Sequence, residues 1–106
     1  MPKYLWSAAY TAEGTKGLMK EGGSQRRASV QQAIEKAGGR LEAFYFAFGD
    51  SDVFVIADMP DAASAAAASM VINASGAVQL RTTVLLTPEE IDAAMRKSVS
   101  YNAPGG

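Results

Sequence analysis

Residues 40–57 read RLEAFYFAFGDSDVFVIA, and this stretch decides the fold. The runs 40–48 and 53–57 are rich in aromatic and β-branched residues, which fit the pleated, half-buried surface of a β-strand. Glycine, serine and two aspartates occupy positions 49–52 between them, and such residues are typical of a tight turn. The stretch therefore predicts an antiparallel β-hairpin.

Both faces of this predicted hairpin are apolar. Phe44, Phe46 and Phe48 fall on one side of the first strand, and Leu41, Ala43, Tyr45 and Ala47 fall on the other. A sheet face that meets water usually carries polar residues at alternate positions. We therefore expect helices of this chain to cover one face and a second copy to cover the other. The expected assembly is a homodimer, and a higher homo-oligomer stays open.

Upstream of the hairpin, the sequence predicts one strand and a helix in two pieces. Residues 3–10 are aromatic and free of glycine and proline, as suits a first strand. Thr11 can cap the helix that follows. The glycine pair at 22–23 costs about 1 kcal/mol per glycine inside a helix, so we expect a break there. Ser24 is then the expected cap of a second piece, which ends at Gly38.

Downstream of the hairpin, the sequence predicts a helix, a strand and a short last helix. Pro60 lies between two candidate capping aspartates, Asp58 and Asp61. The alanine-rich helix behind them has Ala63, Ala66, Ala67, Met70 and Val71 on one stripe, and it closes at Gly76. Residues 78–86 form the predicted fourth strand. The run TPEE at 87–90 combines a threonine cap, a proline at the first helical position and a later glutamate.

The predicted order of elements is βαββαβ plus a short C-terminal helix. This is the split βαβ arrangement of a ferredoxin-like α+β fold with a four-stranded antiparallel sheet. A chain of 106 residues builds one core, so we expect one domain over 1–97 and a tail over 98–106.

The composition excludes several classes of function. Acidic and basic residues nearly balance, at a net charge of -1, which argues against nucleic acids and membrane surfaces as partners. Cysteine and histidine are both absent, which removes Ser-His-Asp and Cys-His catalysis and most zinc or iron sites. No stretch has the spacing of an EF-hand loop, so we expect neither a metal nor a cofactor. No signal core or membrane span is visible, which predicts a cytoplasmic protein.

Several short stretches together resemble the GYD domain family. They are PKYL at 2–5, YTAEG at 10–14, KEGGS at 20–24 with Arg26 and Arg27, the glycines at 38–39, EAFYFAFG at 42–49, LTPEE at 86–90 and KSVSY at 97–101. The family is named after a Gly-x-Tyr-Asp pattern, and Ser51 stands here in place of the tyrosine. The resemblance implies a ferredoxin-like fold akin to dimeric α+β barrel proteins. It implies no settled activity, because related barrels include cofactor-free oxygenases, isomerases and ligand sensors.

The run GGSQRR at 22–27 is a candidate ligand-binding segment. Two guanidinium groups, flexible glycines and the N–H groups of a helix start could hold a carboxylate or phosphate at Arg26 or Arg27. The alternative is a kinked helix whose arginines pair with Glu13, Glu21 or a carboxylate of a partner.

Other candidates lie in the predicted strands and the turn. Tyr10, Tyr45, Trp6 and Arg81 could line a pocket between sheet and helices, or the aromatics could fill core or interface while Arg81 pairs across a strand. Asp52 is a candidate general base or an anchor for the turn backbone. Tyr101 in the tail could cover the pocket of a partner.

Two hypotheses of function follow. The first is a homodimeric module that binds a small apolar ligand with an anionic end, or that serves assembly. The second is a cofactor-independent enzyme of the isomerase or monooxygenase kind, with Tyr10, Tyr45 or Asp52 as acid or base. Whether the protein is an enzyme stays open, although the absence of histidine favours the first hypothesis. A structural dimer without a ligand is the alternative to both.

Overall fold

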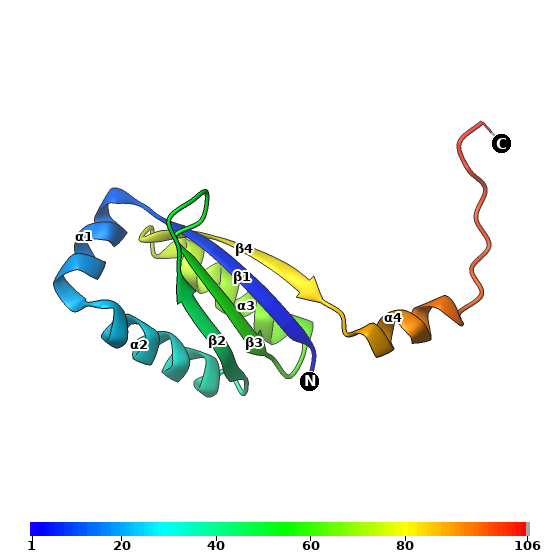
Figure 1. Ribbon diagram of the computed structural model, residues 1–106, viewed down its shortest axis with the longest axis horizontal. Helices are drawn as coiled ribbons and strands as arrows, with labels where there is room; N and C mark the ends of the chain where they lie inside the picture. The colour runs from blue at the N-terminus through cyan, green and yellow to red at the C-terminus, as the bar shows by residue number, and fades with distance from the viewer. Residues whose placement is uncertain (106) are drawn as a thin grey trace.

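The computed structural model describes residues 1–105, which form one antiparallel sheet with helices (Figure 1). The elements in chain order are β1 (Lys3–Tyr10), α1 (Ala12–Glu21), α2 (Gly23–Lys36), β2 (Arg40–Phe46), β3 (Val53–Asp58), α3 (Ala62–Ala74), β4 (Val78–Leu85) and α4 (Pro88–Met95). The strand order is β2-β3-β1-β4, and all neighbours are antiparallel. The predicted α+β ferredoxin-like arrangement is therefore confirmed.

The core lies between the sheet and the helices. β1 is central, so that Trp6 pairs with Val55 of β3 on one side and Thr82 of β4 on the other. The buried apolar side chains are Tyr4, Trp6, Ala8, Ile34, Val53, Val55, Ala57, Met59 and Ala65. Alternate residues of β1 and β3 thus face the helices, and the residues between them form the opposite face, called here the open face.

The N-terminal helix has the expected break. Thr11 caps α1 by accepting a hydrogen bond of 3.2 Å from the Gly14 N–H. Gly22 has a φ of +92°, a backbone conformation that residues with a Cβ rarely adopt. It turns the chain between the two helices. The expected cap at Ser24 is wrong, because α2 begins at Gly23 directly after this turn and leaves Ser24 inside the helix.

The hairpin differs from its prediction in two places. β2 ends at Phe46, and Phe48 lies fully exposed in the loop rather than on the strand. A register shift between Leu41 and Ala43 marks a β-bulge. The bulge turns Leu41 to the same side as Phe44, where both pack against the core. The expected placement of Leu41 on the opposite side from Phe44 is therefore wrong.

The last predicted caps are observed. Asp61 caps α3 by accepting a hydrogen bond of 2.7 Å from the Ser64 N–H, whereas Asp58 belongs to β3. α3 packs on the core through Ala65 and Ala68, while the predicted apolar stripe that contains Met70 is exposed, and its Val71 lies at the edge of a pocket. The capping box at the start of α4 is complete.

The C-terminal segment leaves the body of the protein (Figure 1). We call residues 86–105 the arm. Within the described chain, α4 has no buried residue, and Ile91, Met95, Val99 and Tyr101 are exposed. The radius of gyration is 16.8 Å, compared with about 13 Å for a compact chain of this length. Among residues 1–105, no helix has both the length and the apolar character needed to cross a membrane.

Candidate functional site

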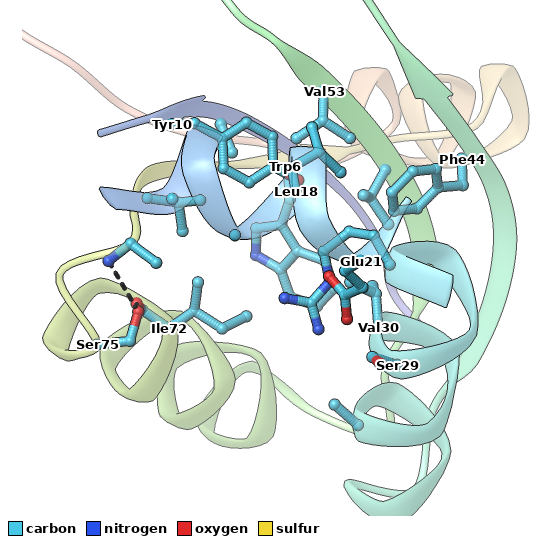
Figure 2. A pocket seen from close by; sticks show the side chains of 18 of the residues that line it. Trp6, Tyr10, Leu18, Glu21, Ser29, Val30, Phe44, Val53, Ile72 and Ser75 are labelled. Atoms are coloured by element: carbon cyan, nitrogen blue, oxygen red, sulfur yellow. Dashed lines mark hydrogen bonds and ion pairs between the residues drawn. The ribbon is translucent and has the colours of Figure 1, made fainter. Parts of the chain in front are cut away.

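A pocket of about 600 Å³ lies between the sheet and helices α1, α2 and α3 (Figure 2). Trp6 and Tyr10 of β1 and Val53 of β3 line it from the sheet. Val30 of α2 and Ile72 of α3 line it from opposite sides. This volume is within the usual range for sites that bind small molecules.

Small residues make the room for this pocket. Gly14 and Gly17 of α1, Ala33 of α2 and Ala68 of α3 all line it. A Cβ at Gly14 would clash with the carbonyl oxygen of Ala77, so this glycine lets α1 approach the start of β4 closely. Larger side chains at these positions would fill the space between the helices and the sheet.

Two buried N–H donors lie in the residues that line the pocket, and we call them the orphan donors. They are Nε1 of Trp6 and Nε of Arg26, the buried side-chain polar atoms of residues 1–105 that have no hydrogen-bond partner. Trp6 is only 3% exposed, so its N–H has no access to bulk water. Each buried unsatisfied donor costs about 1–3 kcal/mol. A hydrogen-bond acceptor that reached these atoms would remove this cost.

Acidic side chains outnumber basic ones in the lining of the pocket. Oε2 of Glu21 lies 3.6 Å from Nε of Arg26, which is an ion pair but too long for a hydrogen bond. Glu13 also lines the pocket. Two carboxylates therefore accompany one guanidinium group, and the lining carries a net negative charge.

Tyr10 lines the pocket at the end of β1. Burial is the main cause that raises the pKa of its hydroxyl above the ordinary value of 10.0. The nearby Arg26 acts in the opposite direction, and the carboxylates of Glu21 and Asp52 add to the rise. The hydroxyl is therefore protonated at neutral pH, and it can donate a hydrogen bond.

Asp52 is engaged with the backbone of β1. Its Oδ2 accepts a hydrogen bond of 2.8 Å from the Tyr10 N–H. Its own N–H donates to the Ala8 carbonyl, and its carbonyl accepts from the Ala47 N–H, both at 2.8 Å. This geometry corresponds to the turn-anchor alternative for Asp52.

Tyr45 and Arg81 belong to the open face instead. In the sheet register, Tyr45 is opposite Phe54, Phe54 is opposite Ser7, and Ser7 is opposite Arg81. These four residues form a row across the sheet, called here the transverse row. Tyr45 also lines a second, smaller hollow beside Arg27 of α2. The structure therefore brings Trp6, Tyr10 and Arg26 together and places Tyr45, Arg81 and Arg27 elsewhere.

Some residues of the pocket were not predicted as ligand contacts. Phe44 lines it from β2, and Glu21 provides the carboxylate beside Arg26. The ion pair of Glu21 and Arg26 is one that the sequence offered as the alternative for the run 22–27, but its place in the lining of a pocket was not predicted. Tyr101 is 76% exposed in the arm. In residues 1–105, no cluster of acidic residues could hold a metal ion.

Comparison with known proteins gives one result. The family model described as the GYD domain matches residues 4–95 of the 106-residue chain. No curated protein and no solved structure matches the chain significantly.

Proposed function

This chain is a member of the GYD domain family, and from that premise we propose that it is a homodimeric module that binds a small molecule in the pocket between sheet and helices. The orphan donors Trp6 Nε1 and Arg26 Nε carry this proposal. They are polar groups in an apolar enclosure of about 600 Å³, and the ligand supplies the hydrogen-bond acceptors that they need.

A second candidate function is cofactor-independent catalysis, and Tyr10 is the observation in its favour. Among the three predicted acid or base residues, Tyr10 lines the pocket, whereas Asp52 holds the backbone of β1 and Tyr45 belongs to the open face. A protonated Tyr10 hydroxyl could act as a general acid on a bound substrate. Because its raised pKa makes it a poor base at neutral pH, binding is the better supported function.

A binding experiment can use 1-aminoanthracene, a neutral apolar fluorophore, as the probe. Trp6 is the only tryptophan of the chain, so energy transfer from Trp6 to the bound probe measures binding, and the variants below locate the site. Ala33→Phe puts a large side chain at the pocket lining, and we expect it to weaken binding at least about tenfold. Ala28→Phe is the matched control, because Ala28 is an exposed residue of the same helix outside the lining. Equal binding by the original protein and both variants would overturn the proposed site.

The open face supports the homodimer. Tyr45 is 71% exposed and Phe54 is 38% exposed, and they are direct neighbours across β2 and β3. The transverse row has aromatic rings at one end and Arg81 at the other. Two copies related by a two-fold axis place the Arg81 of each over the Tyr45 of the other, where guanidinium and ring attract each other. The row is thus complementary to itself.

The arm supports the same assembly, because its exposed apolar side chains gain burial on a second copy. Native mass spectrometry of the purified protein tests both parts of the proposal. The expected result is the mass of a dimer, with a retained small molecule as an adduct where the pocket is filled. A monomer at micromolar concentration would overturn the homodimer, and its adduct would still report on the pocket.

A further inference from the structure

The hydrogen-bonding character of the pocket restricts the chemistry of its ligand. The indole N–H of Trp6 and the Nε–H of Arg26 can only donate. Trp6 is nine-tenths or more buried, and neither donor atom has accessible surface, so a ligand reaches them only when the side chains that cover them move. The ligand must therefore present a hydrogen-bond acceptor to these side chains.

The charge of the pocket disfavours an anion as that acceptor. Glu21 already lies 3.6 Å from Arg26 and partly neutralises it, and Glu13 adds a second carboxylate to the lining. A carboxylate ligand would add a third negative charge to this lining, where the two glutamates repel it and the apolar walls remove part of its hydration. A neutral acceptor satisfies the same donors without this penalty.

The rest of the lining sets the body of the ligand. Side chains of Val30, Ile34, Phe44, Val55 and Ile72 line the pocket from the helices and the sheet. Trp6 and Phe44 present aromatic surface, which favours a flat ring system. The volume of about 600 Å³ is enough for one or two fused rings with a short substituent.

We propose that the ligand is a neutral carbonyl compound on an apolar, flat body, of the ketone, quinone or lactone class, with its oxygen at Trp6 and Arg26. A carbonyl oxygen has two lone pairs and can accept two hydrogen bonds, one for each orphan donor that it reaches. This inference rests on the proposed function, because it names the class of ligand that the same pocket takes. It replaces the anionic end expected from the sequence by a neutral one.

Three naphthalenes that share one ring system test the class. They are 2-acetylnaphthalene, 2-naphthoate and 2-ethylnaphthalene, which carry a ketone, a carboxylate and a hydrocarbon group. The titration is followed by two-dimensional NMR of the 15N-labelled protein, in which the only tryptophan gives a single indole N–H signal. We expect the ketone to bind about tenfold more tightly than the other two and to shift the indole proton downfield, because it forms the missing hydrogen bond.

A pair of arginine variants locates the preference. Arg26→Met keeps an unbranched apolar stem but removes the donors of the side chain, and we expect it to reduce the preference for the ketone over the hydrocarbon by about fivefold or more. Arg27→Met is the control, because Arg27 lines the smaller hollow and not this pocket. An unchanged preference in Arg26→Met would overturn the role of Arg26 in selecting the ligand.

The outcomes separate this inference from the proposed function. Tighter binding of 2-naphthoate than of the ketone would overturn the carbonyl class and leave the pocket as a binding site. Equal binding of ketone and hydrocarbon would likewise overturn it. If none of the naphthalenes binds while 1-aminoanthracene does, the class again is wrong. If 1-aminoanthracene also fails, the proposed function falls and this inference with it.

Discussion

The carboxylate of Asp52 and the backbone of Tyr10 are joined by a hydrogen bond of 2.8 Å. Tyr10 is the last residue of β1, and Asp52 directly precedes β3. The bond therefore attaches the turn of the hairpin to the end of the central strand, next to the pocket that Tyr10 lines. Its function in the fold is to hold this end of the pocket together.

We expect Asp52→Ala to lower the free energy of unfolding by about 1–2 kcal/mol, because the Tyr10 N–H loses its acceptor. Urea denaturation followed by circular dichroism measures the change. Asp50→Ala is the control, because Asp50 is an exposed acid of the same turn. Equal midpoints for Asp52→Ala and the original protein would contradict the anchoring role.

Asp58 makes stability depend on pH at the other end of the sheet. Its carboxylate lies 3.0 Å from Nζ of Lys3 and 3.0 Å from a guanidinium nitrogen of Arg40. The hydrogen bond from Lys3 is the largest cause that lowers the pKa of Asp58 below 3.8; burial opposes it and Arg40 adds to it. A lowered folded-state pKa gives stability that is present above the unfolded-state pKa and is lost as pH falls through the folded-state value.

We therefore expect Asp58→Asn to be less stable than the original protein by about 1–2 kcal/mol at pH 7, a value kept low because Lys3 and Arg40 are partly exposed. The difference should shrink as pH falls below about 4. Urea midpoints of both proteins at pH 7, 5 and 3 measure it. A difference that stays constant over this range would contradict the ion-pair explanation.

The two glycines of α1 that line the pocket should respond in opposite ways to alanine. Gly14→Ala meets the carbonyl oxygen of Ala77 and should destabilise the fold by about 1–3 kcal/mol. Gly17→Ala meets nothing within 4 Å and should stabilise the helix by about 0.5–1 kcal/mol. Thermal unfolding of the pair measures both. Similar shifts of the same sign would mean that the close approach of α1 to Ala77 is not rigid.

The open face gives a prediction on assembly. Tyr45→Asp puts a charge into the proposed dimer interface, and we expect it to raise the dimer dissociation constant at least about hundredfold. Phe48→Asp is the control, since Phe48 is a fully exposed aromatic of the loop outside the sheet. Analytical ultracentrifugation over a range of concentrations measures the constants. Dissociation of both variants alike would point to an interface that is not centred on the sheet.

The arm gives a prediction that separates folding from assembly. The double substitution Ile91→Gln and Met95→Gln removes exposed apolar surface from α4. We expect the free energy of unfolding of the monomer to change by no more than about 0.5 kcal/mol, because these residues have little burial to lose. The dimer, in contrast, should become weaker. Asp92→Asn on the same helix is the control. A large loss of monomer stability would show that α4 packs on its own domain.

The features that the sequence by itself determined are local. The break at Gly22, the caps at Thr11 and Asp61 and the capping box at Thr87 depend on residues within a few positions of each other. Backbone conformation and cap hydrogen bonds are set at that range, and the order of strands and helices follows from them. The resemblance to the GYD domain family also came from short stretches of sequence, and the match of the family model over residues 4–95 bears it out.

Only the tertiary structure decided which candidate residues meet. A single bulge after Leu41 changes which side chains of β2 face the helices, and strand alternation does not reveal where a bulge occurs. Trp6 and Arg26 come to one pocket, and Tyr45 to the opposite face, through the pairing of β1 and β3 and the packing of α2. These relations join residues far apart in the chain, so they depend on how the whole sheet and its helices pack and not on any local pattern.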